Sequence, residues 1–210
     1  MTRLGTVRWA VHIQKTLAKP LIYSRVWPGC KVKCLDDDPS DELKVLLDKA
    51  GADKMIIEEN DNLVFIGQRF RTYAASLGKG YDDFTLRKRR PRTNYRAEAY
   101  KQRYAHRNGT GLIKYYAYGH LNPKQDGFNK FRILNFQTFL EKWINGELAP
   151  EETKNNTDKS SSFYTWSFEN IPSDCIHWEL DKPVTIHNPP PTPRTEFNLT
   201  NYIQTQETQK

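Results

Sequence analysis

Residues 53–71, DKMIIEENDNLVFIGQRFR, contain two apolar runs separated by a short polar segment. The runs Lys54–Ile57 and Leu63–Arg71 are rich in the β-branched and aromatic residues that favour strands. The segment between them, residues 58–62, has the sequence EENDN, a composition suited to a hairpin turn. The stretch therefore predicts a β-hairpin, and the elements on either side decide what kind of sheet it joins.

Helical patterns flank this hairpin on both sides. Upstream, residues 38–51 combine an Asp-Pro start, apolar residues at helical spacing and a final glycine. Downstream, helices are expected to begin at Thr93 or Asn94 and at Asn135, and each is followed by Asn-Gly. Further strands are expected at residues 83–87, 112–118 and 131–134. The predicted order is α-β-β-β-α-β-β-α, an α/β fold with a central mixed β-sheet flanked by helices.

Composition predicts a single domain followed by a tail. A chain of 210 residues with 37% hydrophobic content can bury one ordinary core. We expect the domain to cover residues 1–182, with its core at about 38–146, a polar loop at 149–162 and a C-terminal edge ribbon at 163–182. Residues 183–210 contain the run PPPTP and end in Thr, Gln and Asn, a composition typical of an extended or disordered tail.

The balance of charge favours a polyanionic partner. The formal net charge is +7 and the isoelectric point is about 9.2, which predicts attraction to nucleic acid through counterion release. The alternative is a basic protein that binds no anion, because net charge alone does not define a partner. The sequence has no run of about 18 apolar residues and no apolar signal-peptide region. We therefore expect a cytoplasmic protein with no membrane partner.

Three cysteines, Cys30, Cys34 and Cys175, occur in a chain without a secretory signal. Their odd number favours reduced thiols over a disulfide framework. Cys30 and Cys34 have a spacing that could supply two zinc ligands, but no matching CxxC or His pair supplies the other two. A structural zinc site is therefore not expected.

Positive charge is concentrated between residues 87 and 107, where nine basic residues accompany one acid, Glu98. The basic residues predicted to bind nucleic acid are Arg87, Lys88, Arg89, Arg90, Arg92, Arg96, Lys101, Arg103 and Arg107. Guanidinium groups pair with phosphates through two parallel hydrogen bonds, so phosphate contact is the expected role. The tyrosines of this segment, Tyr95, Tyr100 and Tyr104, have two alternatives, stacking on bases or packing inward. Inward packing is the expectation.

A second group of polar residues surrounds the hairpin. Asp53 stands at the start of the first strand, and Gln68, Arg69 and Arg71 lie on the second. Metal-dependent phosphodiester cleavage needs a carboxylate and a second ligand for Mg²⁺, with a cation beside the developing charge. Asp48, in the preceding helix, is a candidate supporting acid. The alternative interpretation is that these are ordinary surface residues, because acids at strand starts and arginines at strand ends are common.

The order of these elements resembles the core of the PD-(D/E)XK nuclease superfamily over about residues 38–146. Residues 47–53, LDKAGAD, are similar to the stretch that carries the family's metal-binding Asp, which implies that role for Asp53. Residues 83–87, DFTLR, resemble the third core strand. The helix with Glu98 and Lys101, followed by residues 115–119, YYAYG, resembles the family's later helix and strand. The resemblance implies a restriction-endonuclease-like fold and a Holliday-junction-resolvase or restriction type of activity on DNA.

The second strand departs from the family pattern of an acid or Gln, any residue, then Lys. In one register, Gly67-Gln68-Arg69, the acid is missing and Arg69 replaces the lysine; in the other, Gln68-Arg69-Phe70, the basic position is Phe70. Gln68 and Arg69 should also point to opposite faces of the strand. Gln68 could ligate Mg²⁺ weakly through its amide oxygen, and Glu58 or Glu59 could supply a displaced acid. An arginine stays protonated and cannot act as a base.

These features predict a DNA-acting endonuclease. Its Mg²⁺ or Mn²⁺ would be held by Asp53 and Gln68, with Arg69 or Arg71 beside the scissile phosphate. A catalytically inactive nucleic-acid-binding protein with the same fold is the alternative, and a partner-binding protein that uses its Pro-rich tail is a third. Nucleotide hydrolysis is disfavoured because no GxxxxGK[ST] motif occurs, and the five histidines show no HExxH spacing. A homodimer is possible, because many nucleases cut both strands as symmetric dimers.

Overall fold

The computed structural model describes residues 9–34, 47, 50–58, 62–89, 97–155, 161–180 and 182–188. Most of the helix expected at residues 38–51 lies outside these residues, although Leu47 is helical and buried. Residues 189–210 of the expected Pro-rich tail also lie outside them. Within the described residues, no helix is both long enough and apolar enough to cross a membrane.

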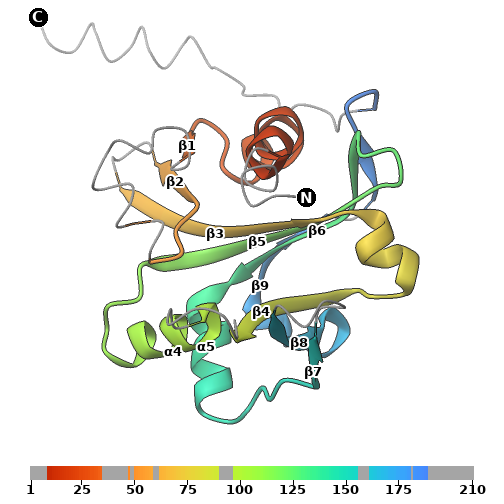
Figure 1. Cartoon of the computed structure of the whole chain (residues 1–210). Helices are drawn as coiled ribbons and strands as arrows, with labels where there is room; N and C mark the ends of the chain where they lie inside the picture. The colour runs from red at the N-terminus through yellow and green to blue at the C-terminus, as the bar shows by residue number, and fades with distance from the viewer. Residues whose placement is uncertain are drawn as a thin grey trace, which may run out of the picture.

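A seven-stranded mixed sheet forms the centre of the molecule (Figure 1). Its first three strands, β1 (Lys31–Cys34), β2 (Lys54–Ile57) and β3 (Leu63–Arg71), form an antiparallel meander. β5 (Ile113–Leu121) then runs parallel to β3, and β6 (Gly127–Asn135) runs antiparallel to β5. Two short strands, β9 (Ile176–Glu179) and β10 (Val184–Thr185), both pair with β6. The predicted hairpin and the predicted α/β fold with a mixed sheet are therefore confirmed.

A smaller antiparallel sheet contains the strand that the sequence placed in the central meander. β4 (Asp83–Arg89) pairs with β8 (Ser162–Ser167), which pairs with β7 (Glu152–Asn155). The strand at residues 83–87 was predicted correctly, but its place beside the hairpin was wrong. Two 3₁₀ turns, η3 (Tyr73–Ala75) and η4 (Leu77–Lys79), separate it from β3. The third strand of the meander is β1, which the sequence analysis did not predict.

Burial explains why β4 lies in a second layer. Four consecutive residues, Asp83 to Leu86, are all buried. Because side chains alternate across a strand, both faces of β4 must be covered. Phe84 and Leu86 pack into an aromatic core, while Asp83 and Thr85 meet arginines of β3. A position beside α4 and α5, on the same face of the central sheet, covers both faces of β4.

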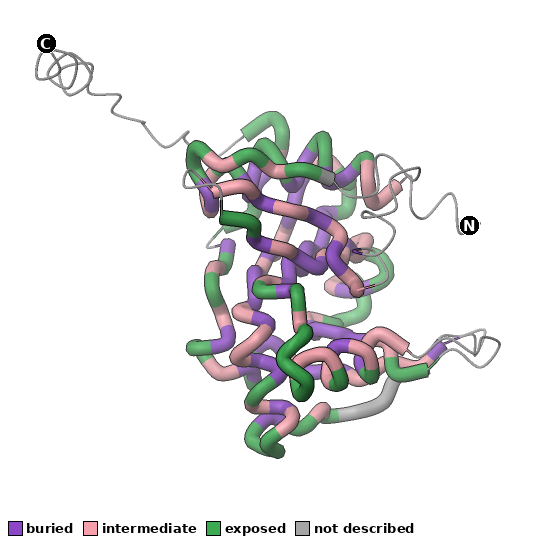
Figure 2. Tube along the Cα trace, turned by 90° about the vertical axis from the view of Figure 1, so that its left-hand side faces the viewer, coloured by how far each residue is buried: buried purple, intermediate pink, exposed green. Residues whose placement is uncertain are grey.

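Helices cover the two faces of the central sheet (Figure 1). On one face lies a helix over residues 9–26, whose middle segment η1 (Gln14–Tyr23) has π-helical turns and contains Pro20, and whose last turn is α2 (Ser24–Val26). On the other face lie α4 (Glu98–Arg107), α5 (Phe136–Ile144) and the smaller sheet. Each face has its own hydrophobic core. Buried residues accordingly run through the middle of the molecule (Figure 2).

The last predicted helix is confirmed as α5. Phe136, Phe139, Leu140 and Trp143 are buried at the spacing of one helix face, although Asn135 makes no side-chain capping hydrogen bond. The expected polar loop at 149–162 contains β7. The expected edge ribbon at 163–182 is divided, since β8 joins the smaller sheet and β9 joins the central one. Two further 3₁₀ turns, η5 (Phe168–Asn170) and η6 (Ser173–Cys175), connect these two strands.

Candidate nucleic-acid interface

Asp53 and Gln68 meet across the β2–β3 hairpin through the backbone of Gln68. The Asp53 carboxylate accepts a hydrogen bond from the Gln68 backbone N–H, with 2.6 Å between oxygen and nitrogen. The Gln68 amide oxygen accepts a hydrogen bond from the Tyr23 hydroxyl at 2.9 Å, on the face covered by η1. The two side chains predicted to share Mg²⁺ are thus held by different partners.

These contacts bear on whether Mg²⁺ fits here, because the ion takes about six oxygen ligands in near-octahedral geometry. Among the described residues, no group of three or more His, Cys, Asp or Glu side chains is arranged to hold a metal ion. Asp48 and Glu59, two acids considered from the sequence, lie outside these residues. The described residues therefore bring no two further side chains of these kinds to Asp53, and the magnesium site stays a prediction.

Arg69 points to the face opposite Gln68, as strand alternation predicts. Its guanidinium group donates to the Thr85 carbonyl oxygen at 2.7 Å and to a Glu98 carboxylate oxygen at 2.6 Å. The second Glu98 oxygen accepts from the Tyr116 hydroxyl at 2.7 Å. We call Arg69, Thr85, Glu98 and Tyr116 the Glu98 cluster. It joins β3, β4 and β5 to the first residue of α4.

Electrostatic interactions within the Glu98 cluster favour the charged forms of both Glu98 and Arg69. Burial alone would raise the pKa of Glu98, but Arg69 and the Tyr116 hydroxyl outweigh burial and lower it. Burial alone would lower the pKa of Arg69, but Glu98 outweighs it and the pKa is raised. Gly67 makes the approach of Tyr116 possible, because a Cβ at this position would lie 2.8 Å from the tyrosine ring.

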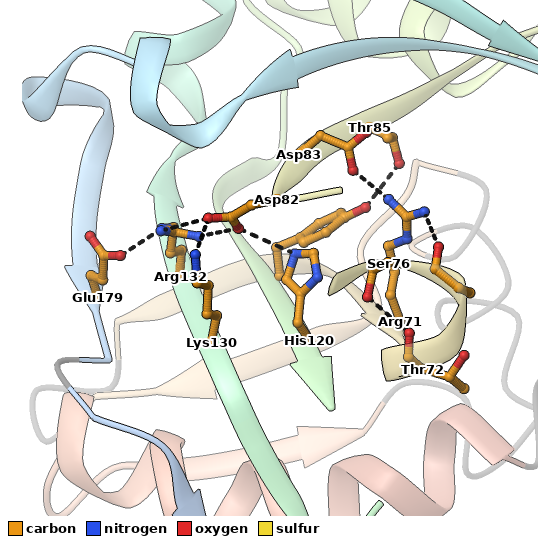
Figure 3. A network of polar contacts seen from close by, with 12 residues as sticks. Arg71, Thr72, Ser76, Asp82, Asp83, Thr85, His120, Lys130, Arg132 and Glu179 are labelled. Carbon is orange, nitrogen blue, oxygen red and sulfur yellow. Dashed lines mark hydrogen bonds and ion pairs between the residues drawn. The ribbon is translucent and has the colours of Figure 1, made fainter. Parts of the chain in front are cut away.

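Arg71, the other arginine expected beside a scissile phosphate, is also engaged inside the protein. It donates to an Asp83 carboxylate oxygen at 2.5 Å and to the Ala75 carbonyl oxygen at 2.7 Å (Figure 3). Arg69 and Arg71 therefore link β3 to β4 and its preceding turns. Their observed partners give both residues a structural role.

A second polar cluster, which sequence reasoning missed, lies beside Arg71 (Figure 3). Asp82 accepts hydrogen bonds from Lys130 and, at 2.8 Å, from Arg132. The Nε of Arg132 also pairs with Glu179 at 2.7 Å. Burial alone would raise the pKa of Asp82, but the hydrogen bonds from Lys130 and Arg132 outweigh it and the pKa is lowered. We call Asp82, Lys130, Arg132 and Glu179 the Asp82 cluster; it connects the segment before β4 to β6 and β9.

The basic segment 87–107 brings several of its charges to one surface. Lys88 and Arg89 end β4, whereas Lys101, Arg103 and Arg107 belong to α4. The Arg87 backbone N–H donates to Glu98, and its guanidinium carbon lies 5.7 Å from the centre of the Phe163 ring. Three of the predicted nucleic-acid-binding residues, Arg90, Arg92 and Arg96, lie outside the described residues, as does Tyr95.

A cavity of about 400 Å³ opens on this surface, and its lining combines cations with aromatic rings. Apart from Ala99, the lining residues are Lys88, Arg89, Arg103 and Arg107, with Tyr100, Tyr104, Trp143 and Tyr164. We call this space the α4 cavity. Lys88 Nζ lies 4.8 Å from the centre of the Tyr164 ring, and the Arg103 guanidinium carbon lies 4.7 Å from a Trp143 ring. No acidic side chain is among the described residues that line it.

The two tyrosines of α4 contradict the prediction that they pack inward. Tyr100 is 49% exposed and Tyr104 is 55% exposed. Their rings are nearly parallel, with centroids 6.2 Å apart and an interplanar angle of 10°. Both also line a smaller cavity of about 180 Å³, which includes Lys101 and Leu112. The tyrosine pair thus forms a wall between two cavities.

Trp143 and Tyr164 are the cavity residues that the sequence analysis did not connect with function. Trp143 lies on the buried face of α5, the helix expected to begin at Asn135, and Tyr164 lies in β8, within the ribbon expected at 163–182. Only tertiary packing brings them beside α4. A signal for the tyrosines was present, because Tyr100 and Tyr104 are four residues apart among basic neighbours, a spacing that places both on one helix face.

Comparisons with protein families, with curated proteins and with solved structures gave no match to this chain, so the functional argument rests on the chemistry of the α4 cavity.

Proposed function

We propose that the protein binds nucleic acid, DNA in the first instance, through the surface around the α4 cavity. The observation that carries this proposal is the meeting of four cations and four aromatic rings with no acidic residue among the described lining. Phosphates pair with Lys and Arg, and nucleobases stack on aromatic side chains. An apolar ligand would leave the cations desolvated without a counter-charge, which costs free energy.

The order of elements supports a restriction-endonuclease-like core as part of this proposal. After the antiparallel meander β1–β2–β3 the chain passes through β4, in the smaller sheet, and then through α4 to β5, which runs parallel to β3. In this proposal α4 and β5 correspond to the later helix and strand of the family resemblance. In this proposal α4 carries the two tyrosines and two of the four cations, while the Glu98 cluster fixes the first residue of α4 to the sheet.

Fluorescence anisotropy with a labelled 20-nucleotide DNA strand tests the proposed binding. The double variant Arg89→Gln/Arg107→Gln removes two exposed cations of the α4 cavity. We expect binding to weaken at least about tenfold, because hydrogen bonds to charged groups contribute about 1.5–3 kcal/mol and 1.4 kcal/mol corresponds to tenfold.

The control is Lys79→Gln/Lys124→Gln, which removes the same charge from two exposed positions outside the cavity. This variant should bind within about twofold of the wild type. Equal losses in the two variants would reduce the effect to net charge and contradict the proposed site. No loss in the cavity variant would also contradict it.

Metal-dependent cleavage of DNA is a second candidate function, favoured by the Asp53 carboxylate at the β2–β3 hairpin. Incubation of supercoiled plasmid with the protein and Mg²⁺ or Mn²⁺ tests it. We expect the wild type to nick or linearise the plasmid and Asp53→Asn to lose this activity. Asp174→Asn, at an exposed acid, is the matched control and should keep it. Inactivity of the wild type with both metals rejects this candidate and leaves the binding proposal standing.

A further inference from the structure

We propose that the α4 cavity binds an unpaired nucleotide, with its base stacked against Tyr100 and Tyr104 and its phosphates on the surrounding cations. This inference rests on the proposed nucleic-acid binding and specifies the strand state that is bound. It predicts a preference for single strands, or for unpaired positions within a duplex, over continuous duplex.

The exposed tyrosine pair is the first support. The two rings lie on one helix face and are about half exposed, so they add little to the hydrophobic core. They lie parallel to each other and line the cavities on both sides. Such a surface offers flat ring faces to a ligand, which is how single-stranded nucleic acids are held without a preference for sequence.

The geometry favours a base beside the pair over a base between the two rings. A base inserted between the two rings would need them about 7 Å apart, because it makes a contact of about 3.5 Å with each ring. The observed centroid separation is 6.2 Å. A base therefore stacks on the side of the pair that faces the α4 cavity, whose volume of about 400 Å³ lies within the range of small-ligand sites.

The cations lie where the sugar-phosphate chain has to pass. Lys88 and Arg89 come from the end of β4, and Arg103 and Arg107 come from α4, so positive charge borders the cavity from two elements. The Nε of Arg103 is buried and has no hydrogen-bond partner among the described residues. Its guanidinium group lies over Trp143, a position that keeps the arginine at the cavity wall.

Continuous duplex does not meet these requirements. In a duplex the faces of the bases are stacked on their neighbours, so none is presented to a protein ring unless the base leaves the helix. Phosphate contacts alone would not favour a single strand over a duplex, because the duplex has the higher charge density. The tyrosine pair therefore distinguishes single strands from duplex, while the cations contribute affinity for both kinds of nucleic acid.

Three probes of equal length separate base stacking from phosphate contact. They are (dT)₂₀, a 20-nucleotide strand of abasic residues, and a 20-base-pair duplex. Anisotropy titrations should show (dT)₂₀ bound at least about fivefold more tightly than the abasic strand and the duplex. The double variant Tyr100→Ala/Tyr104→Ala should lose this advantage, while its affinity for the abasic strand stays within about twofold of the wild type.

Two control variants keep the test specific. Tyr100→Phe/Tyr104→Phe retains the rings and should retain the preference for (dT)₂₀. Tyr81→Ala removes an exposed tyrosine outside the cavity and should change nothing. Circular dichroism confirms that each variant is folded.

The outcomes distinguish this inference from the proposed function. If all three probes bind equally and the alanine variant behaves like the wild type, the unpaired-nucleotide site is rejected. The binding proposal then stands, provided that Arg89→Gln/Arg107→Gln still weakens binding. If that charge variant has no effect, the proposed function itself fails.

Discussion

His120 lies at the boundary between the central sheet and the Asp82 cluster (Figure 3). Its side chain is 1% exposed, and neither ring nitrogen has a hydrogen-bond partner among the described residues. Burial lowers the pKa of His120 to about 4. The Asp82 carboxylate, 4.0 Å from the Nε2 of His120, acts in the opposite direction and raises this pKa. The charges that face it also include Arg71, Asp83 and Arg132, and their effects on its pKa partly cancel. At neutral pH the residue is therefore a neutral ring packed against Tyr118 and Phe168.

This burial predicts that acid destabilises the protein through His120. Above pH 6.5 the residue is neutral in both the folded and the unfolded state, so it adds no pH dependence. As the pH falls from about 6.5 to about 4, only the unfolded state binds the proton readily, and stability is lost. The shift of the His120 pKa from 6.5 to about 4 corresponds to a loss of about 3 kcal/mol in the free energy of unfolding. Urea unfolding at a series of pH values should show it.

The variant His120→Phe should lack this part of the pH dependence, because phenylalanine does not titrate. His187→Phe replaces a histidine that is 79% exposed and should follow the wild-type curve. Parallel curves for wild type and His120→Phe would contradict the assignment. Carboxylates with lowered pKa values, such as Asp82, lose their contribution at lower pH than His120 does.

At the scale of elements, α4 depends on the Glu98 cluster for its position. The helix has few buried residues, Ala99 and Gln102, so hydrophobic burial alone anchors it weakly. Gln102 contributes a hydrogen bond from its side-chain amide to the Ala50 carbonyl oxygen at 2.8 Å. The ion pair between Glu98 and Arg69 fixes the first residue of the helix, next to Ala99 in the lining of the α4 cavity.

Glu98→Gln should therefore be strongly destabilising. The substitution leaves the largely buried Arg69 without its counter-charge, and breaking a buried pair in this way costs about 3–5 kcal/mol. The matched control is Glu147→Gln, which removes an exposed acid that pairs with Lys142 and should lower the free energy of unfolding by less than about 1 kcal/mol. Equal shifts in the urea midpoint for the two variants would contradict the anchoring role.

Local patterns predicted some elements, and long-range contacts decided the rest. The β2–β3 hairpin and α5 were predictable because turn composition and helical spacing are properties of neighbouring residues. The sheet to which β4 belongs was not predictable, because its partner β8 lies far away in the sequence. The partners of Arg69 and Arg71, which the sequence placed near a phosphate, also come from distant segments or from a turn. The basic segment was evident from composition, but the cavity it borders needs Trp143 and Tyr164.

At the scale of the whole molecule, the two faces of the central sheet have different chemistry. The face under η1 is an apolar core of aliphatic and aromatic residues. The opposite face carries the Glu98 cluster, the Asp82 cluster and the α4 cavity. Acids on that face, such as Glu98 and Asp82, are paired with interior arginines, whereas the described lining of the cavity contains no acid. The four cations that line the cavity therefore lie where a polyanion can reach them.

The pairing of β4 with β8 also sets an order for folding during synthesis. The meander, α4 and β5 leave the ribosome before β8 does, because the chain emerges from its N-terminus. Until residues 162–167 have emerged, β4 lacks the strand that pairs with it in the described structure, and the α4 cavity lacks Tyr164. A nascent chain that has not reached this point can therefore form the hairpin but not the complete cavity.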